Sequence, residues 1–325
     1  QHICDAAKEA IDLGMTRYTP AAGTKELRKA ICEKLRRDND MTYTYGDILV
    51  SNGAKHSLFN IFQAILDPGD EGDEVIVPGP FWVSYPELVR MAGGVPVFIP
   101  ATEETNFIPT NKDIASRVTR RTKAIVITSP SNPNGSVWEQ EQLQFVADLA
   151  VSHPFFVVSD EIYEKLLYDG RKHLSIAQLG EQIKSQTFLV NGVSKAYAMT
   201  GWRIGYVAGP RNVISAMSSF QSQATSNPNS IAQYAAMKAL QGDQSCVDAM
   251  VAQFEKRRDA MVEKINAIPG LSCRKPHGAF YVMMNISGLF GKKLNGEAIV
   301  DSMSFTRLLL EDSKVAVVPG IGFGA

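Results

Sequence analysis

Reactive side chains follow directly after several short apolar runs of this sequence. The runs are rich in β-branched residues, which predicts buried strands. Because open parallel sheets bind ligands at the carboxyl ends of their strands, we expect the segments after these runs to meet along one rim. The rim would then hold a carboxylate, a phenol, an amide, two lysines and an arginine. These segments are residues 52–55 (Asn-Gly-Ala-Lys), 129–135 (Ser-Pro-Ser-Asn-Pro-Asn-Gly), 160–163 (Asp-Glu-Ile-Tyr) and 192–203 (Gly-Val-Ser-Lys to Trp-Arg).

Each member of this set also has an ordinary structural interpretation. Asp160 could cap a helix, since aspartate favours that position, and Asn132 before a proline could form only a turn. Lys195 and Arg203 could be surface charges. Taken together the residues are more specific, because the chemistry of one cofactor requires this combination.

That cofactor is pyridoxal 5'-phosphate (PLP). A lysine that forms a Schiff base with it must be partly unprotonated, which burial and neighbouring cations promote, and Lys195 is the candidate. A carboxylate at the pyridine nitrogen, here Asp160, keeps the ring protonated as an electron sink. The phosphate requires N–H groups at a helix N-terminus and a cation, which Gly53, Ala54 and Arg203 can supply.

The elements that must position these residues alternate between strands and helices. Continuous apolar strands between amphipathic helices predict a mostly parallel sheet covered on both faces, which is a three-layer α/β/α domain. We expect strands at residues 47–51, 74–78, 95–100, 124–128, 155–159, 187–191 and 205–208, and helices at 25–38, 55–66, 81–92 and 139–152.

After residue 210 the pattern changes to longer helices. A small α+β domain should follow, with its boundary near Phe254. We therefore divide the chain into a PLP-binding large domain, residues 14–254, and a small domain, residues 1–13 and 255–325. The further expected helices are residues 1–13, 213–222, 230–240, 244–268 and 302–312, and the further expected strands are 278–285 and 315–318.

Composition excludes several other classes of partner. The formal net charge of the 325 residues is -1, so nothing favours binding to nucleic acid or to an anionic membrane. No apolar run approaches the ~20 residues of a membrane span. The four cysteines are isolated from one another and from histidine, which fits neither a metal site nor a disulfide framework and predicts a reducing, cytoplasmic location.

The chain resembles class I (fold type I) PLP-dependent aminotransferases, and is most similar to the bacterial-type branch of aspartate aminotransferases, which includes prephenate aminotransferases. The resemblance runs from residues 18–23 (Tyr-Thr-Pro-Ala-Ala-Gly) to 317–320 (Val-Val-Pro-Gly), and residues 194–206 carry its most specific motif. It implies a homodimer that moves an amino group between an amino acid, aspartate or glutamate, and a 2-oxo acid.

The resemblance also implies a role for each residue of the set. Lys195 would hold PLP and then move a proton on the substrate, and Asp160 would pair with the pyridine nitrogen. Tyr163 and Asn132 would hydrogen-bond the 3-oxygen of the ring, and Trp82 would stack on its face, with Asn132 and Trp82 also near the substrate. The phosphate would be bound by Gly53, Ala54, Arg203, Ser194 (although many relatives place a serine at the position of Gly192) and Tyr18 of the neighbouring subunit.

Lys55 bears on the substrate. In the resembling branch a lysine at this position binds the distal carboxylate, which implies dicarboxylic substrates; alternatively Lys55 only adds charge near the phosphate. Family members also use an arginine near the C-terminus for the α-carboxylate, and we expect the natural chain to continue beyond Ala325, and before Gln1, to supply it and a closing segment. A prephenate aminotransferase, a PLP-dependent C–S lyase and a non-catalytic PLP-binding protein remain alternatives.

Overall fold

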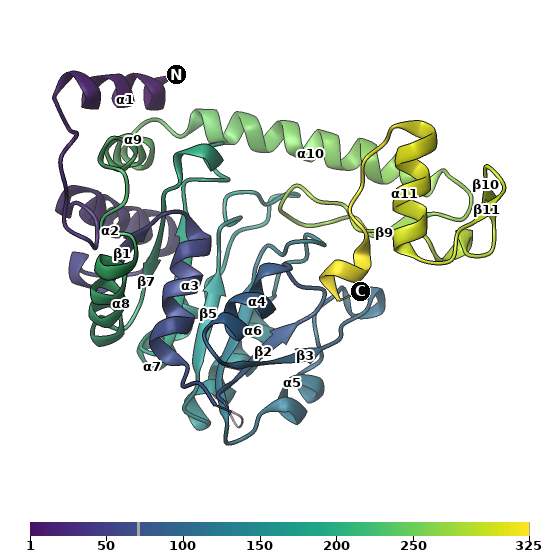
Figure 1. The fold of residues 1–325 in the computed structure, drawn as a ribbon, viewed down its shortest axis with the longest axis horizontal. Coiled ribbons are helices and arrows are strands. Elements are labelled where there is room, and N and C mark those ends of the chain that lie inside the picture. The colour runs from purple at the N-terminus through teal and green to yellow at the C-terminus, as the bar shows by residue number, and fades with distance from the viewer. Residues whose placement is uncertain (70–71, 325) are drawn as a thin grey trace.

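A seven-stranded sheet forms the centre of the computed structural model, which describes residues 1–69 and 72–324 (Figure 1). Its strand order is β1-β7-β6-β5-β4-β2-β3. β7 is antiparallel to both neighbours and the other pairs are parallel, so the carboxyl ends of β1 to β6 share one edge, where β7 begins. The strands are β1 (Ile48–Ser51), β2 (Glu74–Pro78), β3 (Val95–Ile99), β4 (Thr122–Thr128), β5 (Phe156–Asp160), β6 (Thr187–Gly192) and β7 (Gly205–Ala208).

Helices cover both faces of this sheet. Side chains alternate along each strand, and the apolar ones that point to either face must be buried. Leu49 and Val207 point into one apolar core, whereas Ile48 and Tyr206 point into another on the opposite face. The first face is covered by α3 (Ala54–Ile65), α4 (Ser84–Met91) and α8 (Arg211–Ala224). The second is covered by α2 (Lys25–Asn39), α5 (Asn111–Arg117), α6 (Gln140–Ser152), α7 (Glu181–Lys184) and α9 (Ser230–Gln241). The three-layer α/β/α architecture is therefore confirmed; the short helices α5 and α7 were not predicted.

The N-terminal helix α1 (His2–Asp12) packs against α9. Ala6, Ala7 and Ala10 of this helix are buried, and Ala7 belongs to the same apolar core as the alanines of α9. The sequence division placed residues 1–13 in the small domain, whereas these contacts favour placing them with the large domain.

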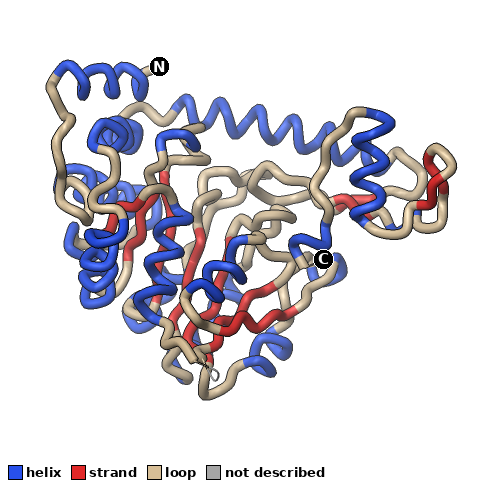
Figure 2. The backbone as a smooth tube through the Cα atoms, viewed as in Figure 1, coloured by secondary structure: helices blue, strands red, loops and turns tan. Residues whose placement is uncertain are grey.

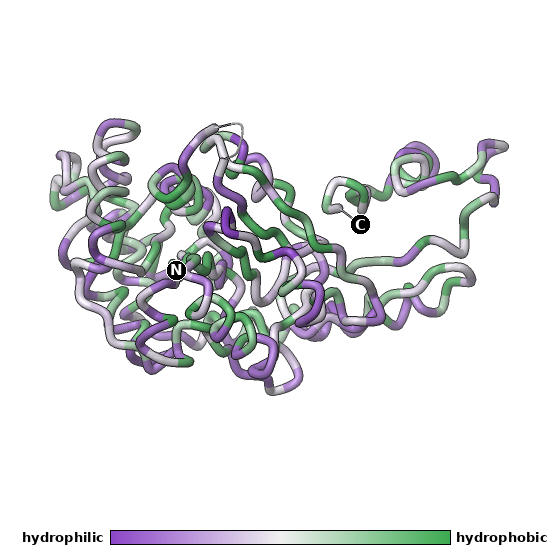
Figure 3. The backbone as a smooth tube through the Cα atoms, turned by 90° about the horizontal axis from the view of Figure 1, so that it is seen from below, coloured by the Kyte–Doolittle hydropathy of each residue, from purple (hydrophilic) through white to green (hydrophobic). Residues whose placement is uncertain are grey.

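The C-terminal part is connected to the body by α10 (Ser245–Asn266), a helix of 22 residues that runs along one side of the molecule (Figure 2). A separate small core of Ile299, Phe305 and Leu308 holds this C-terminal part together. The backbone of the C-terminal part extends away from the body of the molecule in Figure 3. No helix within residues 1–69 and 72–324, α10 included, is long and apolar enough to cross a membrane. The elements of this C-terminal part are β8 (Ser272–Cys273), β9 (Met284–Asn285), β10 (Lys293–Leu294), β11 (Glu297–Ala298), α11 (Ser302–Ser313) and a 3-10 turn at Gly320–Phe323.

Two strand predictions in this part are wrong. Of residues 278–285 only Met284–Asn285 pairs with a strand, because the backbone before it hydrogen-bonds to loops of the large sheet instead. Residues 315–318 form no strand in the described chain, and Val317 packs against the small core. An apolar run shows that a segment is buried, but not which backbone groups will pair with it.

A close approach between β7 and α3 yields a stability prediction. A Cβ atom on Gly205 would lie 2.3 Å from the Ala54 amide nitrogen, and the backbone there has no room to move. We expect Gly205→Ala to lower the free energy of unfolding by about 1–3 kcal/mol in urea denaturation. Gly201→Ala is the control, since nothing lies within 4 Å of its Cβ position. Equal stability of the two variants would contradict this packing.

Candidate active site

A cavity of about 280 Å³ opens at the sheet edge where the parallel strands end. It brings together every predicted site residue except Gly53, which adjoins it, and Tyr18, which is 90% exposed and lies elsewhere. The sequence analysis missed Tyr85, Thr128, Ile162, Thr200 and Tyr281. The full lining is Ala54, Lys55, Trp82, Tyr85, Thr128, Asn132, Asp160, Ile162, Tyr163, Ser194, Lys195, Thr200, Arg203 and Tyr281.

Asp160, the last residue of β5, is a buried carboxylate. The Tyr85 hydroxyl donates to its Oδ2 at 2.7 Å and the Ile162 amide donates to its Oδ1 at 3.3 Å. Burial raises the pKa of Asp160 to about 6, while the Tyr85 hydrogen bond and the charge of Lys195 act in the opposite direction. The carboxyl group is thus fixed in orientation, and it releases its proton at a higher pH than an exposed aspartate does.

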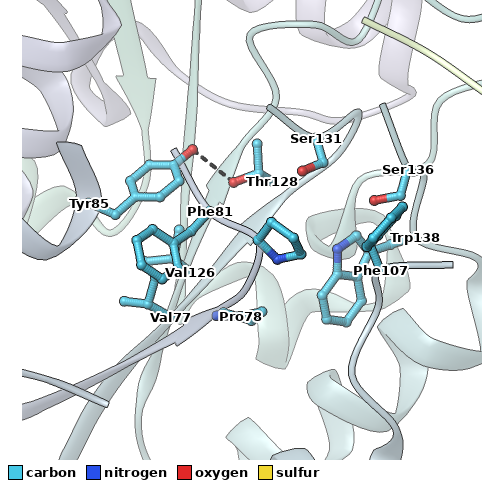
Figure 4. A pocket seen from close by; sticks show the side chains of 11 residues that line it. Val77, Pro78, Phe81, Tyr85, Phe107, Val126, Thr128, Ser131, Ser136 and Trp138 are labelled. Carbon is cyan, nitrogen blue, oxygen red and sulfur yellow. Dashed lines mark hydrogen bonds between the residues drawn. The ribbon is translucent and has the colours of Figure 1, made fainter. Parts of the chain in front are cut away.

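Tyr85 is held in turn by Thr128, whose hydroxyl lies 2.8 Å from the phenol oxygen (Figure 4). Behind this pair lies a second cavity of about 20 Å³, lined by Phe81, Phe107 and Trp138 among others. That volume has room for little more than one water molecule. The larger cavity is therefore the candidate site, and Tyr85 and Thr128 contribute to the walls of both.

Lys195 follows β6 and is half-buried. Burial lowers the pKa of its ammonium group, the Arg203 charge lowers it further, and Asp160 opposes both. The Nζ atom lies 5.4 Å from the ring centre of Phe280 and 5.6 Å from that of Tyr163. An amine with a lowered pKa in an aromatic pocket is suited to nucleophilic chemistry.

An anion-binding corner lies at the N-terminus of α3. Gly53 caps this helix without a side chain, and no acidic residue stands in the first turn. Arg203 is exposed, with its guanidinium anchored to the carbonyl oxygens of Thr200 (2.8 Å) and Asn52 (3.3 Å). A Cβ on Gly53 would lie 2.3 Å from the Arg203 Nη2, so only glycine allows the cation this close to the helix end. A helix N-terminus beside an arginine fits a phosphate group.

Tyr163, Asn132 and Tyr281 form a polar group on another wall. The hydroxyls of Tyr163 and Tyr281 are 2.6 Å apart, and the Asn132 amide donates to Tyr281 at 3.4 Å. Burial, with a further contribution from Tyr281, raises the pKa of Tyr163, so its phenol stays protonated. These groups can donate hydrogen bonds to an oxygen of a bound ring.

Lys55 and Trp82 lie beside each other on the cavity wall. The Lys55 Nζ is 4.8 Å from the indole ring, and that ring meets Tyr85 edge-on at 5.4 Å. Lys55 is exposed, so its charge is available to a ligand. The flat face of Trp82 can cover an aromatic ring.

Comparison with known proteins agrees with this site. Residues 1–325 match the family model "Aminotransferase class I and II". The chain is 49% identical to an aspartate aminotransferase of Bacillus sp. (strain YM-2), covering 100% of this chain and 81% of that protein. It is 46% identical to an aspartate/prephenate aminotransferase of Cereibacter sphaeroides, covering 99% of this chain and 80% of that protein. The crystal structure of the aspartate aminotransferase from Rhizobium meliloti matches with a TM-score of 0.96 and 44% identity, covering 100% of this chain and 81% of that one.

The fold and the site together define an enzyme of the fold type I class. The chain belongs to the class I and II aminotransferases, as the motif in residues 194–206 had indicated. The reaction of this family is the transfer of an amino group, and its members imply PLP as the cofactor. The residues described above fit that group: a buried carboxylate, an amine of lowered pKa and a cationic helix N-terminus surround one cavity.

The buried carboxyl group makes stability depend on pH. The pKa of Asp160 is about 6 in the folded protein and 3.8 where the side chain is exposed, as in the unfolded state. From pH 4 to 6 the folded state therefore keeps a proton that the unfolded state releases. Rising pH therefore favours unfolding across this window. Relative to the wild type, cofactor-free Asp160→Asn should gain up to about 3 kcal/mol in free energy of unfolding between pH 4 and 7.

Urea denaturation at a series of pH values measures this gain. Asp169→Asn is the control, because the pKa of Asp169 is lowered to about 2 by Arg258 and its contribution changes only at more acidic pH. Its difference from the wild type should stay flat from pH 4 to 7. A flat difference for Asp160→Asn as well would show that the Asp160 pKa is not raised.

Proposed function

We propose that this chain transfers the amino group of aspartate or glutamate to a 2-oxo acid, using PLP held in the 280 Å³ cavity. The observation that carries the proposal is the combination of buried Asp160, half-buried Lys195 and the Arg203 corner around one space. Aminotransferase relatives at 44–49% identity support it.

The cavity residues divide the binding of PLP among them. PLP, when bound, supplies an electron sink for negative charge on the substrate α-carbon. Asp160 would hold a proton on the pyridine nitrogen, Trp82 would cover the ring, and Asn132 and Tyr163 would donate hydrogen bonds to the 3-oxygen. The phosphate would be bound by the N-terminus of α3 at Gly53 and Ala54, by the guanidinium of Arg203 and by the hydroxyl of Ser194, which lines the same cavity.

Lys195 has two tasks in this arrangement. Its amine would attach the cofactor, and the lowered pKa of the ammonium group favours the neutral form that this attachment requires. With PLP and a substrate bound, the same amine would be the group that removes the proton from the substrate α-carbon and returns it to the cofactor. Lys195 would thus act as a general base and then as a general acid.

Lys55 supports the choice of a dicarboxylic substrate, since it offers an exposed cation beside Trp82. Relatives named aspartate aminotransferase fit this chemistry. Prephenate, which carries two carboxylates, is a second candidate because other relatives at 45–46% identity are named aspartate/prephenate aminotransferase.

We further propose that the enzyme is a cytoplasmic homodimer. Tyr18 projects from this chain with 90% of its surface exposed and lies outside the chain's own cavity, which suits a phosphate ligand for the neighbouring subunit. The thiols Cys4, Cys32, Cys246 and Cys273 are all free, as a reducing compartment would leave them.

The attachment of PLP to Lys195 can be tested directly. Purified protein incubated with PLP should gain the absorption band of lysine-bound cofactor, and borohydride reduction should fix the cofactor to the peptide that contains Lys195. Lys195→Ala should lose both signals, whereas Lys8→Ala, on exposed α1, should keep them. A wild type without the band, or a label on another lysine, would disprove the proposed site.

The role of Lys55 predicts a difference between substrates. A hydrogen bond to a charged group contributes about 1.5–3 kcal/mol, so Lys55→Ala should lower kcat/KM for aspartate by about 10- to 100-fold. The value for alanine, which has no distal carboxylate, should change little. Lys55→Arg, which keeps the charge, should retain most of the aspartate activity. Equal losses on both amino donors would instead indicate that Lys55 acts near the phosphate.

A further inference from the structure

Tyr281 brings a hydroxyl from the segment after α10 to the wall of the cavity. Its oxygen lies 2.6 Å from the hydroxyl of Tyr163 and accepts a hydrogen bond from Asn132 at 3.4 Å. It thus contacts both side chains that the proposed function assigns to the 3-oxygen of the cofactor.

The backbone around Tyr281 is fixed against the large domain. The amides of His277 and Gly278 both donate to the Gly135 carbonyl at 3.0 Å, and the Ala279 amide donates to the Leu166 carbonyl at 2.9 Å. A Cβ on Gly278 would lie 2.7 Å from the Leu166 carbonyl oxygen, so the backbone at Gly278 is in close contact with the backbone at Leu166. The segment therefore lies between the loop that carries Asn132 and the loop that follows Tyr163.

The number of available protons determines the direction of the Tyr163–Tyr281 hydrogen bond. A phenol has one hydrogen to donate. If Tyr163 gives its hydrogen to the ring oxygen, the 2.6 Å contact requires Tyr281 to donate to the Tyr163 oxygen. Asn132 has two N–H groups, so it can reach Tyr281 and the ring oxygen together.

We propose that Tyr281 is a positioning residue of the cofactor site, which donates to Tyr163 and so directs the Tyr163 proton to the cofactor 3-oxygen. This inference rests on the proposed function. Donation to an oxygen strengthens the bond that the same hydroxyl gives onward, because chains of hydrogen bonds polarise one another. Tyr281 therefore favours the state of the cofactor in which the 3-oxygen carries negative charge.

The other groups that face Tyr163 stay in place when the Tyr281 hydroxyl is removed. They are Asp160 at the end of β5, Lys195 after β6 with Nζ 5.6 Å from the Tyr163 ring, and the neutral amide of Asn132. Burial raises the pKa of Tyr163 and of Tyr281, so both phenols remain protonated at neutral pH. Removal of the Tyr281 hydroxyl breaks both its bond to Tyr163 and its bond from Asn132, and the double variant with Tyr163→Phe separates the two contributions.

The test is a pH titration of the absorption band of bound PLP in Tyr281→Phe, Tyr163→Phe and the double variant. Tyr281→Phe keeps the ring, which packs on Phe280 at 4.7 Å, so the protein should fold. The midpoint of its titration should rise by about 0.5–1 pH unit, and that of Tyr163→Phe should rise further. In the Tyr163→Phe background the second substitution should add nothing, since the route through Tyr163 is already lost.

Tyr197→Phe is the matched control, because it removes a phenol bonded to Gln244 at 2.7 Å outside the cavity and should leave the midpoint unchanged. Tyr281→Leu, which also lacks a donor, should raise the midpoint at least as far as Tyr281→Phe. An unmoved midpoint in both Tyr281 variants, or fully additive shifts in the double variant, would overturn the role of Tyr281 while leaving PLP binding intact. A wild type without a titrating band would overturn the proposed function and this inference together.

Discussion

The burial of the Asp160 carboxyl group is the constraint on which the rest of the site depends. An isolated buried carboxylate is costly, so the groups around it must supply hydrogen bonds and opposite charge. Tyr85 and the Ile162 amide supply the first, and Lys195 supplies the second. The same burial acts on the lysine in the opposite sense, because it lowers an ammonium pKa as it raises a carboxyl pKa. Burial therefore raises the pKa of Asp160 and lowers that of Lys195, so the two pKa values move toward each other.

The short segment after β5 separates the charges of the site from those of the core. Asp160 and Tyr163 face the cavity, whereas Glu161 and Glu164 point away from it. Glu161 accepts hydrogen bonds from Ser159 (2.8 Å) and Ser175 (2.6 Å) and pairs with His173, while Glu164 forms an ion pair with Lys34 and accepts from Asn39 at 3.0 Å. Breaking a buried pair is far more costly than its net worth, so this network holds the segment in one conformation. Glu161 and Glu164, which do not line the cavity, thus help to hold Asp160 and Tyr163 in their orientations.

The sequence could predict the part of the site that follows from sheet topology. Lys195, Asp160 and Asn132 follow apolar strands, and parallel strands place such residues on one edge whatever the details of packing. Tyr85 gave a weaker signal, because an aromatic residue three positions after Trp82 is equally typical of a helix core. Tyr281 gave none, since its apolar run is typical of a strand, and the backbone partners of residues 277–279 before it lie more than 100 residues away in the chain. Long-range hydrogen bonds of loops leave no periodic pattern in the sequence.

These loop contacts also bear on the division into domains. Residues 277–281 follow α10 in the chain, yet their hydrogen bonds and the buried Ala279 join them to the large sheet. The core of Ile299, Phe305 and Leu308 belongs to a different cluster, which begins at Met284. A boundary drawn by chain order, at Phe254 or anywhere else in α10, therefore separates Tyr281 from the large-sheet loops to which its segment is hydrogen-bonded. The division that matches the contacts passes between Tyr281 and Met284, so that any motion of the small core relative to the sheet would leave the two bonded phenols together on the side of the cofactor.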